Sequence, residues 1–344
     1  MTVYKTLQGY RIKYLSSDPS NSQYGDIWYN SIEKKIKFTG NAGGAWASGG
    51  NLNTARWNCR ATVGTQTAGI TFAGYTQTGS AMAETEEYNG TSWSEVNDLP
   101  DTVTDIGGGG TQTAAFMSGG NSLPGAPDVR IDKCLNYDGT SWTESGDLPF
   151  VSGQGAGCGT QTAGIHSGGL QNPGNNVTNK TGEYNGTSWT DGGDYPKNHG
   201  YHSMTGTQTA TLSGMSINPG ESPNQNAEFY EYNGSSWTAA GNSSIKRYAG
   251  GSAGTQTAGL IFGGGPTNTS GAITSTESYN GSSFTTEGDL ATGGNYLHGG
   301  GTNTSALCIG GSGPAGAGPN QAMNHTQEWD SPPATGGVRS VDVS

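Results

Sequence analysis

Histidines, cysteines and recurring aspartates are the side chains that could do chemistry in this 344-residue sequence. Among the five histidines, His199 and His202 are the closest pair, in the segment Asn-His-Gly-Tyr-His. Imidazole is a common copper and zinc ligand, so a metal site would begin with this pair. The stretch 48 residues later carries Arg247 and Gly250 at the matching positions. This mismatch favours a polar strand near a rim, and we predict no metal ligand.

Four aspartates could supply the paired carboxylates that glycoside hydrolysis requires. They are Asp98, Asp147, Asp194 and Asp289. All four occupy one position of a repeat, and an aspartate that recurs in a turn is there to bond its own backbone. The sequence holds no serine-hydrolase elbow, zinc-protease motif or P-loop. We therefore predict no catalytic residue and no cofactor, and expect that the protein is not an enzyme.

The four cysteines are Cys59, Cys134, Cys158 and Cys308. Their spacings match neither zinc sites nor the disulfide frameworks of small secreted domains. They are therefore interpreted as small buried hydrophobes, which suits synthesis in a reducing cytoplasm.

Charge and hydropathy exclude two classes of partner. The formal net charge is −12, with 15 Lys and Arg against 27 Asp and Glu. Such a surface repels nucleic acid and anionic membranes, so neither is an expected partner. No stretch approaches the roughly 20 apolar residues of a membrane helix, and Met1–Lys5 lacks the apolar core of a secretion signal.

An internal repeat dominates the sequence. The motif Gly-Thr-Gln-Thr-Ala begins at Gly64, Gly110, Gly159, Gly206 and Gly254, and the variant Gly-Thr-Asn-Thr-Ser begins at Gly301. The steps between them are 46, 49, 47, 48 and 47 residues. This period is typical of propeller blades and too long for leucine-rich or ankyrin units.

A second motif interleaves with the first. It reads Tyr-Asn-Gly-Thr-Ser-Trp at Tyr88–Trp93 and recurs, with small variations, in the next four repeats. Asn-Gly between two β-prone runs predicts a tight hairpin, because both central residues of a type I′ turn need a positive φ. The aromatic residue on the outer strand is expected to be structural. These residues are Trp46, Trp93, Trp142, Trp189, Trp237 and Phe284.

Each repeat therefore holds four strands, two around Thr-Gln-Thr and two around Asn-Gly, which is one propeller blade. The third position after the first turn is always apolar, and its residues are Ile70, Phe116, Ile165, Leu212, Leu260 and Leu307. This column predicts a core-facing position. The next column is mixed, which suggests a less constrained face. It holds Thr71, Met117, His166, Ser213, Ile261 and Cys308.

The two ends of the repeat array are incomplete in complementary ways. Trp46 stands 47 residues before Trp93, so an outer strand precedes the first full repeat. The last repeat reaches Trp329 and lacks its own outer strand. The strand near Trp46 would complete the last blade and remove an exposed sheet edge. We therefore predict an all-β, six-bladed propeller closed by this N-terminal strand, with a short N-terminal arm.

These repeats resemble the Kelch repeat. In that family a Gly-Gly pair ends one strand, and a Tyr and then a Trp follow, as in Gly168–Gly169, Tyr184 and Trp189. The resemblance covers residues 44 to about 331. The chain departs from the pattern at Phe284, which replaces Trp, and at Trp329, which stands where Tyr is expected. Some Kelch-like propellers are copper oxidases, so the resemblance keeps a propeller enzyme as a remote alternative.

The first 40 residues resemble a different group of proteins. Tyr14–Pro19, Gly25–Ser31 and Lys35–Phe38 look like segments of virion and tail-fibre proteins of tailed bacteriophages. The Gly-Thr-Gln-Thr-Ala repeat is similar to Kelch-like proteins of marine phages. The resemblance implies a tail-associated virion structural protein, made in the host cytoplasm. Three parts are expected: a docking arm over 1–43 with a possible β-hairpin, a propeller over 44–331, and a C-terminal tail over 332–344.

The loops after the Gly-Gly pairs vary most between repeats and are the expected binding segments. Variable loops on a rigid scaffold are where recognition normally resides, although neutral drift gives the same variation. The candidate binding residues are Tyr75, Asn121, Asn172, Asn218 and Asn268. Few aromatic residues occur in these loops, Tyr75 being one, so a sugar-stacking platform is not obvious there.

The expected function is that of a virion structural protein. The propeller would act as a protein–protein interaction module, and residues 1–43 would dock to other virion proteins. The alternative is an adhesin that recognises a host surface glycan or protein.

Overall fold

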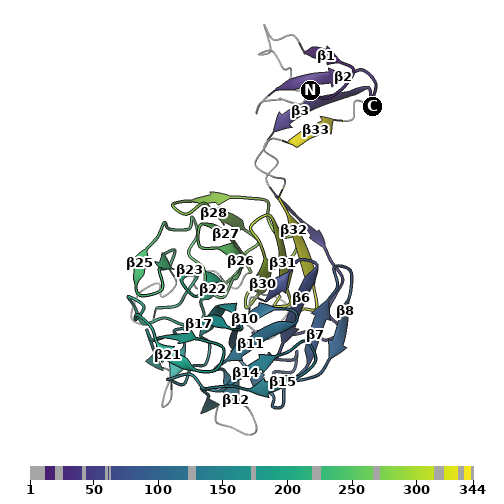
Figure 1. Cartoon of the computed structure of the whole chain (residues 1–344). Helices are drawn as coiled ribbons and strands as arrows, with labels where there is room; N and C mark the ends of the chain where they lie inside the picture. Colours follow the sequence, from purple (N-terminus) through teal and green to yellow (C-terminus); the bar gives the residue numbers. More distant parts are fainter. Residues whose placement is uncertain are drawn as a thin grey trace. The chain divides into compact units, whose positions relative to one another are not determined.

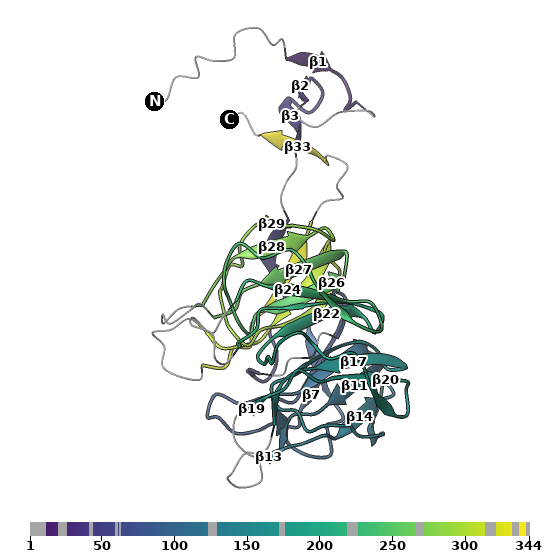
Figure 2. The ribbon, with the colours of Figure 1, turned by 90° about the vertical axis from the view of Figure 1, so that its left-hand side faces the viewer.

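The computed structural model describes residues 12–19, 26–40, 44–58, 61, 63–122, 129–171, 176–218, 226–265, 272–313, 321–331 and 337–341. All regular elements among them are β-strands. The chain forms two compact units. We call residues 45–330 the propeller-like unit, and residues 1–44 with 331–344 the terminal unit. Figures 1 and 2 show the ribbon from two directions.

Six antiparallel four-stranded sheets make up most of the propeller-like unit, and they surround a common centre (Figure 1). The first contains β5 (Gly64–Thr65), β6 (Ala68–Phe72), β7 (Thr85–Tyr88) and β8 (Trp93–Val96). The second contains β10 (Gly107–Thr111), β11 (Ala114–Ser118), β14 (Cys134–Tyr137) and β15 (Trp142–Glu144). The third contains β16 (Ala156–Thr160), β17 (Ala163–Ser167), β20 (Thr181–Tyr184) and β21 (Trp189–Asp191).

The remaining three sheets follow the same order. The fourth contains β22 (Ser203–Thr207), β23 (Ala210–Gly214), β24 (Phe229–Tyr232) and β25 (Trp237–Ala239). The fifth contains β26 (Gly251–Thr255), β27 (Ala258–Phe262), β28 (Thr276–Tyr279) and β29 (Phe284–Thr286). The sixth contains β30 (His298–Gly301), β31 (Ser305–Ile309), β32 (Thr326–Asp330) and β4 (Ala45–Ser48). Trp329 pairs with Trp46, so the sixth sheet takes its outer strand from the N-terminal side, as the repeat phase predicts.

Short strands extend the loops on one side of two sheets. These are β9 (Val103–Thr104), β12 (Asn121–Ser122), β13 (Val129–Arg130), β18 (Leu170–Gln171) and β19 (Asn176–Val177). β12 lies between β9 and β13, and β18 pairs with β19. β9 places the segment before β10 beside the loop that follows Gly119–Gly120, and isolated bridges such as Gly153↔Leu170 and Gly200↔Ile217 join the corresponding segments in other sheets.

Both repeated hairpins have a local cause. At the outer turn, the Asn89 side-chain oxygen accepts hydrogen bonds from the backbone N–H groups of Thr91 and Ser92, at 3.0 and 2.9 Å. The next residue, Gly90, has a φ of 87°, but Asn89 does not have a positive φ, and Tyr88 pairs with Trp93 across a four-residue turn. The expected type I′ turn with two positive φ values is therefore wrong. At the inner hairpin Gly110 has a φ of 108°, and a Cβ there would lie 2.2 Å from the Ala114 carbonyl oxygen. Only glycine fits both restraints, which explains why this position recurs.

The core is built from both faces of each sheet. The predicted inward column, represented by Phe116 and Leu260, is fully buried. The neighbouring column was expected on a less constrained face, and the structure corrects this: Met117, His166 and Ser213 are also fully buried. The reason is that the second, third and fourth sheets, which carry these residues, each pack between two neighbouring sheets, so neither face meets solvent near the centre.

The recurring glutamine of the Gly-Thr-Gln-Thr repeat connects neighbouring sheets. The Gln112 side-chain amide donates to the carbonyl oxygens of Gly69 and Tyr88, at 3.0 and 2.7 Å. Gln161, Gln208 and Gln256 make the equivalent pair of bonds to the sheet that precedes them. Each glutamine therefore satisfies two carbonyl groups where neighbouring sheets meet, which a local sequence reading cannot show.

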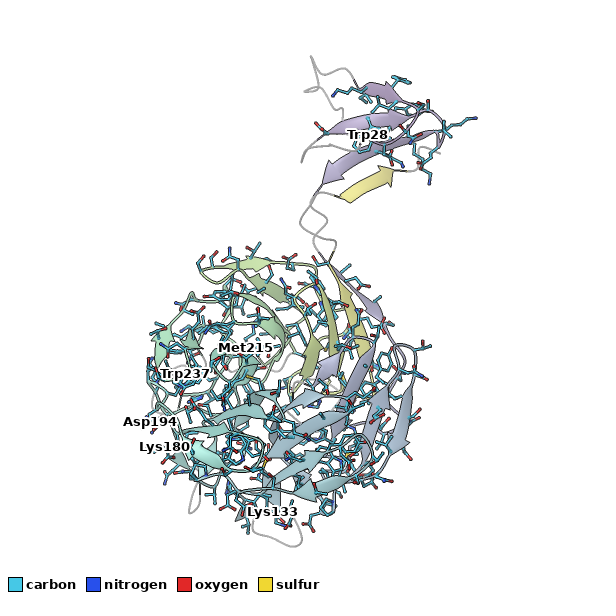
Figure 3. All side chains as sticks on the ribbon, in the orientation of Figure 1. Trp28, Lys133, Lys180, Asp194, Met215 and Trp237 are labelled. Carbon is cyan, nitrogen blue, oxygen red and sulfur yellow. The ribbon has the colours of Figure 1, made fainter. Side chains whose placement is uncertain are left out.

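The repeated Tyr and Trp also act between sheets. Trp142 donates from its indole N–H to the Thr85 hydroxyl at 3.1 Å, and Trp237 does the same to Thr181 at 3.1 Å (Figure 3). The Tyr137 hydroxyl donates to the Glu87 carboxylate at 3.0 Å. Each of these aromatic side chains is buried, so its polar end needs a partner and finds one on the preceding sheet.

The terminal unit is one four-stranded sheet in the order β1-β2-β3-β33. Its strands are β1 (Lys13–Leu15), β2 (Ile27–Asn30), β3 (Lys35–Gly40) and β33 (Gly337–Val341). β2 and β3 form a hairpin, and β33 pairs with β3 from Gly40↔Gly337 to Ile36↔Val341. The segment expected to be a separate C-terminal tail therefore contributes a strand to this sheet. Ala45 pairs with Asp330, so the chain enters and leaves the sixth sheet at neighbouring positions.

Candidate recognition face

Six residues with a left-handed backbone mark one end of the propeller-like unit. They stand five or six residues before the Gly-Thr motif of each repeat and have φ values from 53° to 64°. They are Asn58, Asp105, Gln154, Tyr201, Ala249 and Tyr296. A non-glycine residue in this region costs about 1–3 kcal/mol, and such strain gathers at functional sites. We call these six residues the left-handed ring.

Backbone hydrogen bonds connect consecutive members of the left-handed ring. The pairs are Asp105 N to Asn58 O at 3.1 Å, Gln154 N to Asp105 O at 2.8 Å, Tyr201 N to Gln154 O at 3.0 Å, and Ala249 N to Tyr201 O at 2.9 Å. Leu297 N continues the series to Ala249 O at 3.4 Å. In each pair, the backbone N–H of the later residue donates to the carbonyl oxygen of the residue in the preceding repeat. These hydrogen bonds restrain the backbone that carries the side chains of the left-handed ring.

Five half-buried aromatic side chains gather at this ring. Trp57 stacks on Tyr75 with ring centroids 4.7 Å apart and planes at 23°, and Trp57 meets Tyr296 edge-on at 5.2 Å. Tyr201, Tyr248 and Tyr296 contact one another at 6.2–6.3 Å. We call these five residues the aromatic cluster. They come from the first, fourth, fifth and sixth repeats and form a continuous surface.

Hydrogen bonds hold the Trp57–Tyr75 stack in place. The two residues bridge through their backbones, and the Trp57 indole N–H donates to the Thr76 carbonyl oxygen at 3.3 Å. The Tyr75 hydroxyl donates to the Asp105 carboxylate at 3.2 Å. Asp105 is buried and also accepts from the side-chain amides of Asn58 and Asn121. The polar ends of both rings are thus engaged inside the protein, and the rings are fixed in one orientation.

The predicted binding residues divide into three groups. Tyr75 belongs to the aromatic cluster, and Asn121 supports it through Asp105 at 2.8 Å. Asn218 is buried and accepts a hydrogen bond from Ser216, apart from the aromatic cluster. Asn172 and Asn268 lie outside the described residues.

Four members of the cluster were missed by the sequence analysis: Trp57, Tyr201, Tyr248 and Tyr296. The predicted binding segments are the loops after Gly-Gly, whereas these four residues precede the innermost strands. A usable signal exists, because Tyr201 and Tyr296 both stand five residues before their Gly-Thr motif. Alignment of the columns upstream of the motif would have placed them at equivalent positions.

Four of the five histidines, His166, His199, His202 and His298, are buried, and His325 is exposed. His166 lies between the hydroxyl groups of Ser118 and Ser152, at 2.9 and 2.8 Å. His199 stacks on Tyr195 at 3.7 Å and meets His202 edge-on at 4.2 Å. Among the described residues, no group of three or more His, Cys, Asp or Glu side chains is arranged to hold a metal ion.

Acid pH is expected to destabilise the protein through two buried histidines. Burial lowers the pKa of His166 to about 3, with a smaller contribution from His199, and burial lowers the pKa of His199 to about 3 as well. The unfolded chain binds these protons at an ordinary pKa near 6.5, so stability is full above that pH and falls as the pH drops toward 3. At pH 5 each histidine should lower the free energy of unfolding by about 2 kcal/mol relative to neutral pH.

Urea denaturation of wild type and His166→Gln at pH 7.5 and pH 5 tests this expectation. The variant should lose less stability between the two pH values than the wild type. Equal losses in both proteins would show that His166 does not take up a proton on unfolding.

The recurring aspartates and the cysteines have structural surroundings. Asp194 forms an exposed ion pair with Lys180 at 3.0 Å (Figure 3), and Asp289 accepts from Thr274 at 3.3 Å. Burial raises the pKa of the Cys134 and Cys158 thiols to about 12, which keeps both protonated. Cys59 lies outside the described residues.

The terminal unit combines a polar interior with an apolar exterior. Lys37 is buried between Asp18 at 2.7 Å and Glu33 at 2.5 Å, and buried Trp28 (Figure 3) donates to Asp18 at 3.0 Å. Six large hydrophobic side chains are exposed among the described residues, and four belong to this small unit. These four are Ile12, Tyr14, Ile27 and Ile32, with exposed fractions of 44%, 77%, 49% and 73%.

Six repeated four-stranded sheets and their central packing define an all-β protein with a propeller-like fold. Among solved structures the chain is similar to that of YjhT, with a TM-score of 0.66 and 11% sequence identity, over 85% of this chain and 99% of that one. At this identity the likeness shows the fold alone. No protein family and no curated protein matches the chain by sequence. In the described part of the chain, no helix is long and apolar enough to span a membrane.

Proposed function

We propose that the chain is a non-enzymatic, tail-associated structural protein of a bacteriophage virion. Its terminal unit docks to other virion proteins, and its propeller acts as an interaction module. The observation that carries this proposal is the concentration of exposed apolar side chains on the terminal unit. Exposed apolar patches on a small sheet favour contact with another protein. The resemblance of residues 14–38 to segments of phage virion proteins supports the same assignment.

We further infer a closed, six-bladed, Kelch-like propeller. Trp46 in the sixth sheet donates to Thr276 in the fifth at 2.8 Å, and Gln66 in the first donates to the Trp329 carbonyl oxygen in the sixth at 2.8 Å. The innermost strands contact one another in the order β5, β10, β16, β22, β26, β30 and back to β5. The first glycines of all six Gly-Thr motifs line one central cavity. Each of these contacts supports closure without a free sheet edge.

Virion incorporation tests the docking role. Chains that carry Tyr14→Ser and Ile32→Ser should fold normally but be depleted from purified particles, as measured by immunoblotting and by antibody labelling in electron microscopy. The matched control is Ile245→Ser, which removes an exposed isoleucine from the propeller-like unit (37% exposed). Normal incorporation of the terminal-unit variant would contradict docking through this surface, and absence of the wild-type chain from particles would contradict the virion assignment.

Recognition of a host surface is a second candidate function, which the aromatic cluster favours. The left-handed ring places large side chains at one end of the propeller, although its positive φ values are strained. The stacked Trp57–Tyr75 pair lies at the same end. Rigid aromatic side chains on a preorganised base are what a binding site requires.

A further inference from the structure

We infer that the aromatic cluster, together with the amide side chains of Gln154 and Asn295, is a binding site for a neutral glycan. The inference rests on the proposed recognition role of the propeller and names the class of ligand that this face takes. It concerns a surface different from the terminal unit that is proposed to dock to the virion.

The aromatic cluster forms an extended apolar surface. Trp57 and Tyr75 form a stacked pair, and the three tyrosines Tyr201, Tyr248 and Tyr296 continue from the edge of Trp57. All five are partly exposed. One face of a pyranose ring consists of C–H groups with a small positive charge, and these pack against the electron-rich face of an aromatic ring. A run of adjoining rings suits an oligosaccharide better than a single sugar.

Amide side chains beside the aromatic cluster offer hydrogen-bond acceptors. The side-chain oxygens of Gln154 and Asn295 are buried and have no hydrogen-bond partner among the described residues. Gln154 is a member of the left-handed ring, and Asn295 directly precedes the member Tyr296. A buried acceptor without a partner is costly, so each oxygen is suited to a donor that a ligand brings. Sugar hydroxyl groups are donors of this kind.

Charge at the site further restricts the class of ligand. The Asp105 carboxylate is buried, and it accepts hydrogen bonds from the side chains of Asn58, Tyr75, Thr104 and Asn121. Two arginines stand two residues before ring members, but both are fully buried and paired inward, Arg56 with Glu86 and Arg247 with Glu277. These charges are therefore not offered to a ligand. With a net charge of −12 on the chain, the site favours a neutral ligand over a phosphorylated or sulfated one.

The chemistry also separates a glycan from a protein segment. A peptide groove is usually built from aliphatic and aromatic side chains that enclose apolar anchors. The surface here consists of partly exposed aromatic rings, with the half-buried amide side chains of Gln154 and Asn295 beside them. This combination of flat apolar faces and dispersed polar atoms matches the alternation of C–H faces and hydroxyl edges in a sugar.

The test uses the purified full chain on an array of neutral oligosaccharides, with sialylated and sulfated oligosaccharides as anionic comparators. We expect the wild type to bind at least one neutral glycan. Trp57→Ala and Tyr296→Ala should each weaken that binding by about tenfold, measured by calorimetry with the glycan found on the array. Trp57→Phe should restore most of the affinity because it retains a ring, and Gln154→Ala should weaken binding with the cluster intact.

Tyr14→Ser is the matched control, since it removes an exposed aromatic ring from the terminal unit and should leave glycan affinity unchanged. Circular dichroism and thermal melting establish that each variant is folded, and Trp57→Phe and Gln154→Ala keep the test valid if an alanine variant unfolds. No binding of wild type to any neutral glycan, binding to anionic glycans alone, or unchanged affinity in folded Trp57→Ala and Tyr296→Ala would overturn the inference. Virion incorporation, assayed separately, should not change in Trp57→Ala, so failure of the glycan site and failure of the docking role give different results.

Discussion

Removal of the strand near Trp46 is expected to destabilise the propeller more than any single substitution. A chain of residues 44–331 retains β4, whereas a chain of residues 49–331 exposes the edge of β32. The shorter chain loses the pairing of Trp46 with Trp329 and the contact of Trp46 with Phe262 at 4.8 Å. Trp46 is half-buried, so the lost packing of its side chain costs less than the roughly 3–5 kcal/mol of a fully buried tryptophan, and the backbone bonds of a strand are lost in addition.

The comparison of these two truncations isolates the closing strand, because both lack the terminal unit. Urea denaturation should give a much lower midpoint for 49–331, and light scattering should show association through the free edge. Full-length protein and the 44–331 chain should unfold at similar midpoints. If 49–331 were as stable as 44–331, the sixth sheet would not depend on the N-terminal strand and the proposed closure would be wrong.

Arg247→Met is expected to lower the free energy of unfolding by about 3–5 kcal/mol, because it leaves a buried carboxylate without its cation. The Arg247 guanidinium donates to Glu277 at 2.6 Å and to the carbonyl oxygens of Gly263 and Ser275 at 3.1 and 2.8 Å. Neither charged side chain is exposed to more than 2%. Burial lowers the pKa of Arg247, while Glu277 opposes that shift.

The double variant Arg247→Met with Glu277→Leu should recover most of the lost stability, since it removes the orphaned charge together with its partner. Lys133→Met is the matched control at an exposed cation, which pairs with Asp101 and Glu144 at 3.2 Å and is 42% exposed. Lys133→Met should lower the free energy of unfolding by less than about 1 kcal/mol. Equal costs for Arg247→Met and Lys133→Met would contradict the assignment of Arg247–Glu277 as a buried pair that the fold depends on.

Local features of this fold follow from the sequence because short-range chemistry controls them. The Asn89-Gly90 turn forms through a positive φ and the bonds of one side chain, and the inward column at Phe116 follows from strand alternation. Even the pairing of Trp46 with Trp329 is predictable, since a constant period fixes which strand is missing from the last repeat.

Contacts between repeats could be recognised only in the tertiary structure. The recurrence of Gln112 and its equivalents is visible in the sequence, but not that each donates to two carbonyl groups of the preceding sheet. The pairing of β33 with β3 depends on the two chain ends leaving the sixth sheet side by side. Neither contact has a signature in local composition or periodicity.

The sequence by itself thus determined the class of fold, the number of repeats and the phase in which the first and last strands meet. Only the tertiary structure decided where the candidate binding surface lies. Trp57 and Tyr296 are separated by 239 residues and touch at 5.2 Å because the sheets surround a common centre. The repeat spacing places Tyr201 and Tyr296 at equivalent positions, but it does not show which side chains touch, because contact depends on how the sheets pack together.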